Sequence, residues 1–137
     1  MKRLLLAIFV WLSILPVAAQ DDADVAAAEA SAVAWLALTD SGRYAESWQE
    51  ASSFFRAAIT SEDWSQALQR ARASFGALRT RETASAQYAT SLPGAPDGEY
   101  VVFEFSASFE NKASAVETVT AMKDLDGEWR VGGYFIR

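Results

Sequence analysis

The sequence contains no cysteine and no histidine among its 137 residues. Without cysteine there is no disulfide, no thiol nucleophile and no thiolate ligand for a metal. Without histidine, the most frequent general base and the most frequent zinc ligand are missing as well. The sequence also has no glycine-rich phosphate loop and no Gly-x-Ser-x-Gly motif. These absences exclude the common hydrolase and zinc-enzyme templates, and they predict a chain with no cofactor and no metal.

Positive charge is also scarce, since 12 lysines and arginines stand against 18 aspartates and glutamates, for a net charge of −6. A chain with this balance repels the phosphates of nucleic acids and the anionic surface of lipid bilayers. The composition therefore predicts that nucleic acid is not a partner.

Long hydrophobic runs are confined to the beginning of the chain. Lys2 and Arg3 precede a run over residues 4–15 that carries no charge and ends before Pro16. A membrane-spanning helix needs about 20 apolar residues, and this run has only 12. A cationic head followed by a short apolar run is typical of a secretory signal peptide rather than of a retained membrane anchor.

Small residues follow the apolar run at Val17 and Ala19, where signal peptidase requires them, so we expect cleavage between Ala19 and Gln20. The prediction is a signal peptide over residues 1–19 and a single periplasmic or secreted domain over residues 20–137, with no stable membrane anchor after cleavage. Those 118 residues are enough for one hydrophobic core. Since there is no disulfide, that core must hold the fold.

The first half of the domain has helical periodicity. Residues 21–39 are rich in alanine and end before Gly42, residues 44–58 place aromatic side chains on one side, and a third helix begins after Thr60 and ends at Gly76. Thr60 is followed three residues later by Asp63, as in a capping motif. The stripe predicted to be buried comprises Val25, Ala28, Ala32, Trp35, Leu36 and Thr39 in the first helix and Trp64, Leu68, Ala71 and Phe75 in the third.

After Gly76 the period changes to two, and β-branched and aromatic residues replace alanine. This pattern predicts four strands, near residues 78–92, 99–110, 113–124 and 128–137, joined by turn-forming segments into an antiparallel meander. The predicted fold class is α+β, with N-terminal helices packed on a curved four-stranded antiparallel sheet.

The hairpin between the second and third strands decides which acids face the core. If Asn111 and Lys112 form a two-residue turn, Glu110 lies opposite Ala113, and Glu104 and Glu117 both point away from the helices. The face toward the helices then has no carboxylate and no basic group. The predicted core side is Val101, Phe103, Phe105, Ala107 and Phe109 with Ser114, Val116, Thr118, Thr120 and Met122, and the outer side is Tyr100, Val102, Glu104, Ser106 and Ser108 with Ala115, Glu117, Val119, Ala121 and Lys123.

Residues 124–128 resemble part of a calcium loop, but there is no acid at the closing position and a strand follows directly. We therefore interpret the segment as a hairpin turn.

A group of arginine, tyrosine and tryptophan side chains supplies the candidate binding residues. Arginine and tyrosine together can hold an anionic group through paired hydrogen bonds and a hydroxyl. Trp35 and Trp48 flank the Asp-Ser-Gly break at Gly42, where core packing is the expected role and stacking on a ligand the alternative. The candidate residues are Tyr44, Trp48, Arg81, Tyr88, Arg130 and Tyr134.

Several segments resemble a bacterial exported family known as domain of unknown function 4019. The most specific is the Leu-Pro-Gly-x-Pro-x-Gly-x-Tyr element over residues 92–100, and others lie at residues 35–48, 108–119 and 127–136. The resemblance implies no catalytic residues. Helices followed by a curved antiparallel sheet also look, more distantly, like the cone of the nuclear transport factor 2 and cystatin-like folds, whose members include enzymes and binding modules.

These features predict a non-enzymatic exported domain that binds a small amphipathic or anionic ligand or an envelope protein, or that forms a homodimer through its outer sheet face. One alternative is an isomerase or dehydratase in which Glu117 is the base and Tyr88 or Tyr134 donates to the oxyanion, which requires Glu117 to lie inside. The other is a structural envelope component that acts through self-association.

Overall fold

The computed structural model describes residues 17–137, and the apolar run of the predicted signal peptide lies outside the described residues. Helix α1 is Val17–Asp40, and three short helices follow: α2 (Tyr44–Glu50), α3 (Ser53–Ala58) and α4 (Ser61–Ala73). The strands are β1 (Leu78–Ala89), β2 (Tyr100–Phe109), β3 (Lys112–Lys123) and β4 (Trp129–Ile136). They form one antiparallel sheet in the order β1-β2-β3-β4.

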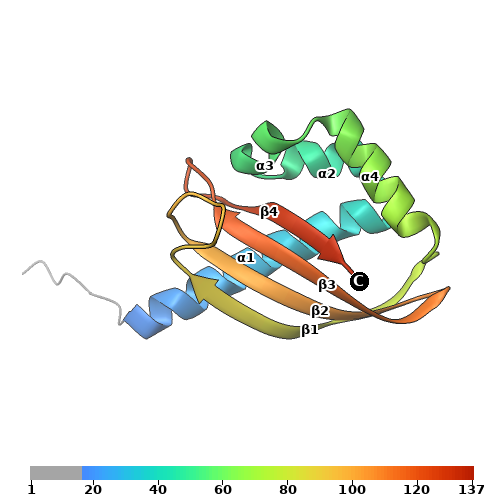
Figure 1. Ribbon diagram of the computed structural model, residues 1–137. Coiled ribbons are helices and arrows are strands. Elements are labelled where there is room, and N and C mark those ends of the chain that lie inside the picture. Colours follow the sequence, from blue (N-terminus) through green and yellow to red (C-terminus); the bar gives the residue numbers. More distant parts are fainter. Residues whose placement is uncertain (1–16) are drawn as a thin grey trace, which may run out of the picture.

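The helices lie against this open sheet (Figure 1). The long helix α1 contacts all four strands, while α2 and α4 pack against each other and α3 lies against β4. This arrangement confirms the predicted α+β class and the antiparallel meander. The likeness to the cone of nuclear transport factor 2 stays a prediction.

The segment predicted as one helix over residues 44–58 is divided into α2 and α3 at Ala51 and Ser52. The backbone N–H of Ser52 donates to the carbonyl oxygen of Val131 in β4, at 2.8 Å, so it is not available to a continuous helix. The Ser52 hydroxyl instead accepts from Phe55 N at 3.2 Å and caps α3. The predicted cap of α4 is confirmed, because Thr60 Oγ1 accepts from Asp63 N at 3.2 Å.

The core lies between α1 and the sheet. The predicted stripe of α1 is confirmed, since Ala28, Ala32, Trp35, Leu36 and Thr39 are all buried and Val25 is half-buried. In α4, Trp64 and Leu68 are buried as expected, but Ala71 is exposed and Arg72 takes its place in the interior. A charged side chain therefore continues an otherwise apolar stripe.

The predicted register between β2 and β3 is wrong by one residue. Phe109 pairs with Lys112 across a Glu110–Asn111 turn. A β-bulge between Ala107 and Phe109 then adds one residue to β3, so that Phe105 lies opposite Glu117. The turn is held from outside the hairpin, because Glu110 N donates to Ala77 O and Asn111 N donates to Phe75 O, both at 2.8 Å. Moving a two-residue turn back by one residue leaves the same faces opposite each other. The extra residue of the bulge is therefore what exchanges the two faces of β3.

The faces of β2 are as predicted, but those of β3 are reversed. The core side of β3 consists of Ala115, Glu117, Val119 and Ala121, whereas Val116, Thr118, Thr120 and Met122 are on the outer face. Met122 and its partner Tyr100 are nevertheless buried on that outer face. The core side of the sheet therefore carries a carboxylate, contrary to the expectation. In β4, Val131 is fully buried and Tyr134 packs against the core, while Phe135 is 59% exposed on the outer face.

Candidate functional site

Glu117 is fully buried and has a partner for each carboxylate oxygen. Arg81 Nε donates to Oε1 at 2.7 Å, and the hydroxyl of Tyr134 donates to Oε2. The expectation that Glu117 points outward is wrong, for the reason of register given above. Glu104 does point outward, with 45% of its side chain exposed and Oε1 lying 3.8 Å from Arg137 Nη2.

Arg81 connects Glu117 to a second ion pair at the end of α1. Its Nη1 and Nη2 atoms donate to the two carboxylate oxygens of Asp40, at 2.7 and 2.9 Å. Arg72 Nη2 also donates to Asp40, at 2.9 Å, and its Nη1 donates to Thr39 Oγ1 at 3.3 Å. Two arginines and two carboxylates thus form one charge-balanced group. We call it the buried charge network (Asp40, Arg72, Arg81, Glu117 and Tyr134), and it joins α1, α4, β1, β3 and β4.

The electrostatics of the network shift the pKa values of Asp40 and Tyr134 in opposite directions. Burial would raise the pKa of Asp40, but hydrogen bonds and charge from Arg81 and Arg72 outweigh it and hold the pKa below its usual value. Burial raises the pKa of Tyr134, and the charge of Glu117 raises it further. The Tyr134 hydroxyl therefore stays protonated and donates to Glu117. The two bonds to Glu117 hold the carboxylate in place.

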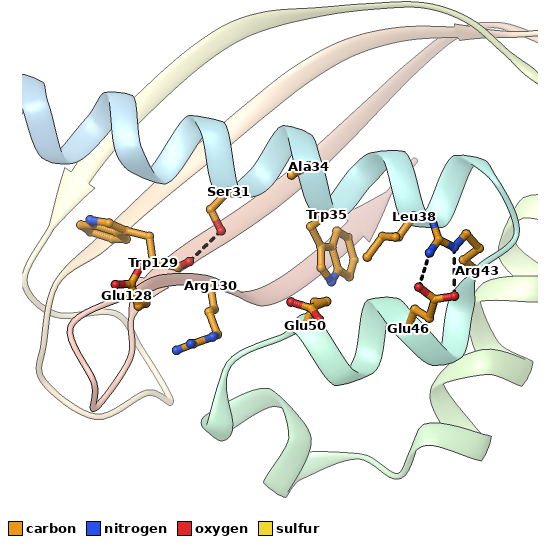
Figure 2. A pocket seen from close by; sticks show the side chains of 10 residues that line it. All are labelled: Ser31, Ala34, Trp35, Leu38, Arg43, Glu46, Glu50, Glu128, Trp129 and Arg130. Atoms are coloured by element: carbon orange, nitrogen blue, oxygen red, sulfur yellow. Dashed lines mark hydrogen bonds and ion pairs between the residues drawn. The ribbon is translucent and has the colours of Figure 1, made fainter.

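A separate cleft of about 530 Å³ opens on the surface between α1, α2 and the beginning of β4 (Figure 2). Its apolar side is formed by α1, from Ala34, Trp35 and Leu38. Trp35 is 3% exposed and is fixed by a hydrogen bond from Nε1 to Ser47 O at 2.8 Å. Figure 2 shows Trp129 at one end of the cleft and Arg43 at the other.

The charged residues of the cleft divide into paired and unpaired groups. Arg43 Nε donates to Glu46 Oε1 at 3.0 Å. Arg130 is held by Asp126, with N–O distances of 2.7 and 2.8 Å, and by Asp124 at 3.3 Å. Glu50 and Glu128 are exposed and have no ion-pair partner within residues 17–137. The free charge of the cleft is therefore negative.

The structure brings together only two of the six candidate binding residues. Arg81 and Tyr134 meet at Glu117 in the interior. Arg130 lines the cleft but is held by its aspartates. The other three lie elsewhere: the Tyr88 hydroxyl donates to Glu99 Oε1 at 3.0 Å, Trp48 Nε1 donates to Ile59 O at 2.8 Å, and Tyr44 packs half-buried on the core.

Sequence reasoning missed Asp40 and Arg72 in the network and Glu50 and Glu128 in the cleft. A signal for Arg72 was present, because it follows Leu68 by four residues and Trp64 by eight, which is helical spacing for one face. For Glu50 and Glu128 no signal existed, since they are far apart in the sequence and only the packing of α2 near β4 brings them to one cleft.

Within residues 17–137, no helix combines the length and apolar character needed to cross a bilayer. The same residues contain no cluster of three or more acidic or histidine side chains arranged to hold a metal ion. Residues 124–128 form the hairpin turn expected of them, since Asp124 N donates to Glu128 O at 2.8 Å and Gly127 N donates to Asp124 O at 2.9 Å.

Comparison with known proteins gives one match. Neither the curated proteins nor the solved structures contain a match to this chain. A family model described as "Protein of unknown function (DUF4019)" matches residues 31–134, from the middle of α1 to near the end of β4. This range includes the buried charge network and all the residues that line the cleft. The chain belongs to this DUF4019 family.

Proposed function

We propose that the chain is an exported, non-enzymatic binding domain whose cleft between α1, α2 and β4 takes a small amphipathic ligand with a positive charge. The observation that carries the proposal is the combination of an apolar wall, made by Trp35 and Leu38, with the unpaired carboxylates of Glu50 and Glu128. Ligand sites commonly pair an apolar lining with a few polar groups that fix orientation.

The sign of the ligand's charge follows from which groups are already paired. The candidate arginine and tyrosine residues suggested an anionic ligand. In this cleft an anion would have to displace Asp126 from Arg130 or Glu46 from Arg43. A cation needs no such exchange, because Glu50 and Glu128 are free to receive it. The net charge of −6 also attracts cations to the surface as a whole.

The position of Glu117 supports binding without turnover. A general base must reach the proton that it removes, directly or through one water molecule. Glu117, the fully buried carboxylate, already bonds to Arg81 and Tyr134, and it does not line the cleft.

Export is supported by the first residues, where Lys2 and Arg3 precede 12 uncharged residues and a proline. The proposed location is the periplasm or the outside of the cell. The mass of the protein recovered from a bacterial periplasmic extract tests this step, because cleavage leaves Gln20 as the first residue. An intact Met1 in the membrane fraction contradicts it.

The ligand proposal is tested with two small probes of similar shape and opposite charge, phenethylamine and 3-phenylpropionate. We expect phenethylamine to shift the NMR signals of the Trp35 and Trp129 indoles and of α2, and the anion to leave them unchanged. The double variant Glu50→Gln/Glu128→Gln should lower the affinity for phenethylamine about threefold to tenfold, as expected for the loss of exposed charge pairs.

The matched control is Glu110→Gln, which removes an exposed carboxylate at the β2–β3 turn, outside the cleft. It should leave binding unchanged. Equal binding of amine and anion, or an equal loss in the control, would show that the cleft does not select a cation.

One observation favours a second candidate, an isomerase or dehydratase. The contact between Glu117 and the Tyr134 hydroxyl places a carboxylate beside a proton donor inside the fold, as that mechanism requires. Substrate would need a path to Glu117. Hydrogen–deuterium exchange, measured with and without a soluble ketone such as cyclohexanone, tests whether a substrate can reach Glu117. If the amides of β3 and β4 are equally protected in both samples, this second candidate is excluded.

A further inference from the structure

A second hollow, of about 400 Å³, lies between α3, the β1–β2 loop and the β3–β4 hairpin, at the same end of the sheet as the cleft. It shares no lining residue with the cleft. We call it the hairpin hollow. Its apolar lining consists of Phe54, Ala57, Pro96, Tyr100, Met122 and Leu125.

We propose that the hairpin hollow is a docking site for a protein partner that inserts an apolar side chain flanked by basic residues. Two of the lining side chains are more exposed than folding requires. Leu125 is 98% exposed and Phe54 is 37% exposed. Both lie on the border of the hollow, so an inserted side chain would contact them together.

Leu125 is not needed for the turn that carries it. The turn is made by Asp124 and by Gly127, which has a φ of +84° and donates its N–H to Asp124 O. At an exposed turn position such as residue 125, a polar residue is more favourable than leucine. Single exposed apolar residues are common, but an exposed leucine beside a preformed apolar hollow is typical of an interaction surface.

Hydrogen bonds hold the walls of the hollow together. Ser53 donates to the Asp124 carboxylate from its backbone N at 3.0 Å and from its hydroxyl at 2.5 Å, which ties α3 to the hairpin. Tyr100 is 2% exposed, and its hydroxyl donates to Pro96 O within the loop. A surface fixed in this way loses little conformational entropy on binding, which favours affinity.

The charges around the hollow decide between possible occupants. Three carboxylates, of Asp97, Glu99 and Asp124, line it together with one cation, Lys123. Glu99 is paired with Lys123 and Asp124 with Arg130, so the charge left without an ion-pair partner within residues 17–137 is the negative charge of Asp97. A second copy of the chain would bring the same acidic border and a net charge of −6. Like charges at an interface oppose association, and opposite charges favour it. The favoured occupant is therefore a basic segment of another protein.

The test uses three acetylated and amidated pentapeptides as probes: Lys-Leu-Lys-Leu-Lys, Glu-Leu-Glu-Leu-Glu and Lys-Ser-Lys-Ser-Lys. Only the first combines apolar and basic side chains. We expect it alone to bind in calorimetry, and to shift the NMR signals of residues 53–57, 96–100 and 122–125. Binding of the acidic peptide, or equal binding of the serine peptide, overturns the proposal.

Leu125→Ser should lower the affinity for the first peptide about tenfold, because it removes a leucine contact. Phe135→Ser is the matched control, since Phe135 is also exposed, at 59%, but does not line the hollow and lies near the end of β4, opposite Thr118. Both variants should unfold at the wild-type temperature. An equal loss in the control contradicts the proposed place of binding.

Two further outcomes would reject the proposed partner. A dimer that forms in sedimentation velocity without peptide, and that Leu125→Ser dissociates, would identify a second copy as the occupant. Peptide signals confined to residues 31–50 would place the peptide in the cleft. The Glu50→Gln/Glu128→Gln variant distinguishes the cleft from the hairpin hollow. It should lower the affinity for phenethylamine and leave the affinity for the peptide unchanged.

Discussion

Arg81 Nε lies 2.7 Å from Oε1 of Glu117, and this contact brings a buried carboxylate on β3 into the same ion-pair group as Asp40 on α1. Taking two charges from water is costly, so such a pair is not by itself a strong source of stability. The position of the pair matters more. It fixes the edge strand β1, where most residues are exposed, to the interior of the domain.

Replacement of Arg81 by methionine should destabilise the fold strongly. The variant leaves Glu117 buried beside Tyr134 with no positive partner, and loss of one member of a buried ion pair costs about 3–5 kcal/mol. Urea unfolding followed by tryptophan fluorescence measures the change. The control is Arg79→Met, two residues away and exposed, with an expected change below about 0.5 kcal/mol. A loss below about 1 kcal/mol in Arg81→Met would mean that water reaches Glu117.

The lowered pKa of Asp40 predicts that acid weakens the fold through this residue. Its folded pKa lies below its unfolded value of about 3.9, so its stabilisation is complete above that pH and is lost as the pH falls through the folded pKa. Asp40→Asn should therefore be less stable than wild type at pH 6, with a smaller difference at pH 2. Unfolding free energies at the two pH values measure this. A difference that does not shrink in acid would contradict the prediction.

Two glycines with the same backbone conformation predict different costs for alanine. Gly76 and Gly94 have φ of +73° and +77°, where an L side chain costs about 1–2 kcal/mol. At Gly94 an added Cβ meets nothing within 4 Å, but at Gly76 it would lie 2.9 Å from Glu110 Cβ. Gly76→Ala should therefore lose about 1–3 kcal/mol more than Gly94→Ala in thermal unfolding. Equal losses would mean that the β2–β3 turn moves freely.

The sequence was sufficient to predict the order and type of nearly all elements, because each depends on local pattern. The apolar period of α1, the cap at Thr60 and the alternation of β2 are properties of neighbouring residues. The hairpin register was not predictable in this way. The faces of β3 are set by a β-bulge between Ala107 and Phe109. The bulge adjoins a turn whose backbone N–H groups donate to Ala77 and Phe75, in the connection between α4 and β1.

The same limit explains why the sites were missed. Alternation along β3 permits either face to be buried, and the register of the assumed Asn111–Lys112 turn placed Glu117 outside. Its partner Arg81 lies 36 residues away, so no local pattern indicated a buried ion pair. A buried charge is acceptable only when its partner is present. The cleft likewise depends on α1, α2 and β4 meeting in space. The local sequence pattern therefore predicts helices and strands. A site formed by segments that are distant in the sequence can be identified only once their packing is known.

Lysine substitutions at two adjacent residues of β3 distinguish the two registers directly. Thr118 lies on the outer face opposite Glu104, and Val119 is fully buried opposite Phe103. Thr118→Lys should therefore change the unfolding free energy by less than about 0.5 kcal/mol, since the new cation lies beside a carboxylate. Val119→Lys buries an unpaired charge and should prevent folding, while the milder Val119→Thr should cost about 1–3 kcal/mol. If Thr118→Lys is the damaging change and Val119→Thr is tolerated, Glu117 faces solvent and the buried charge network does not form.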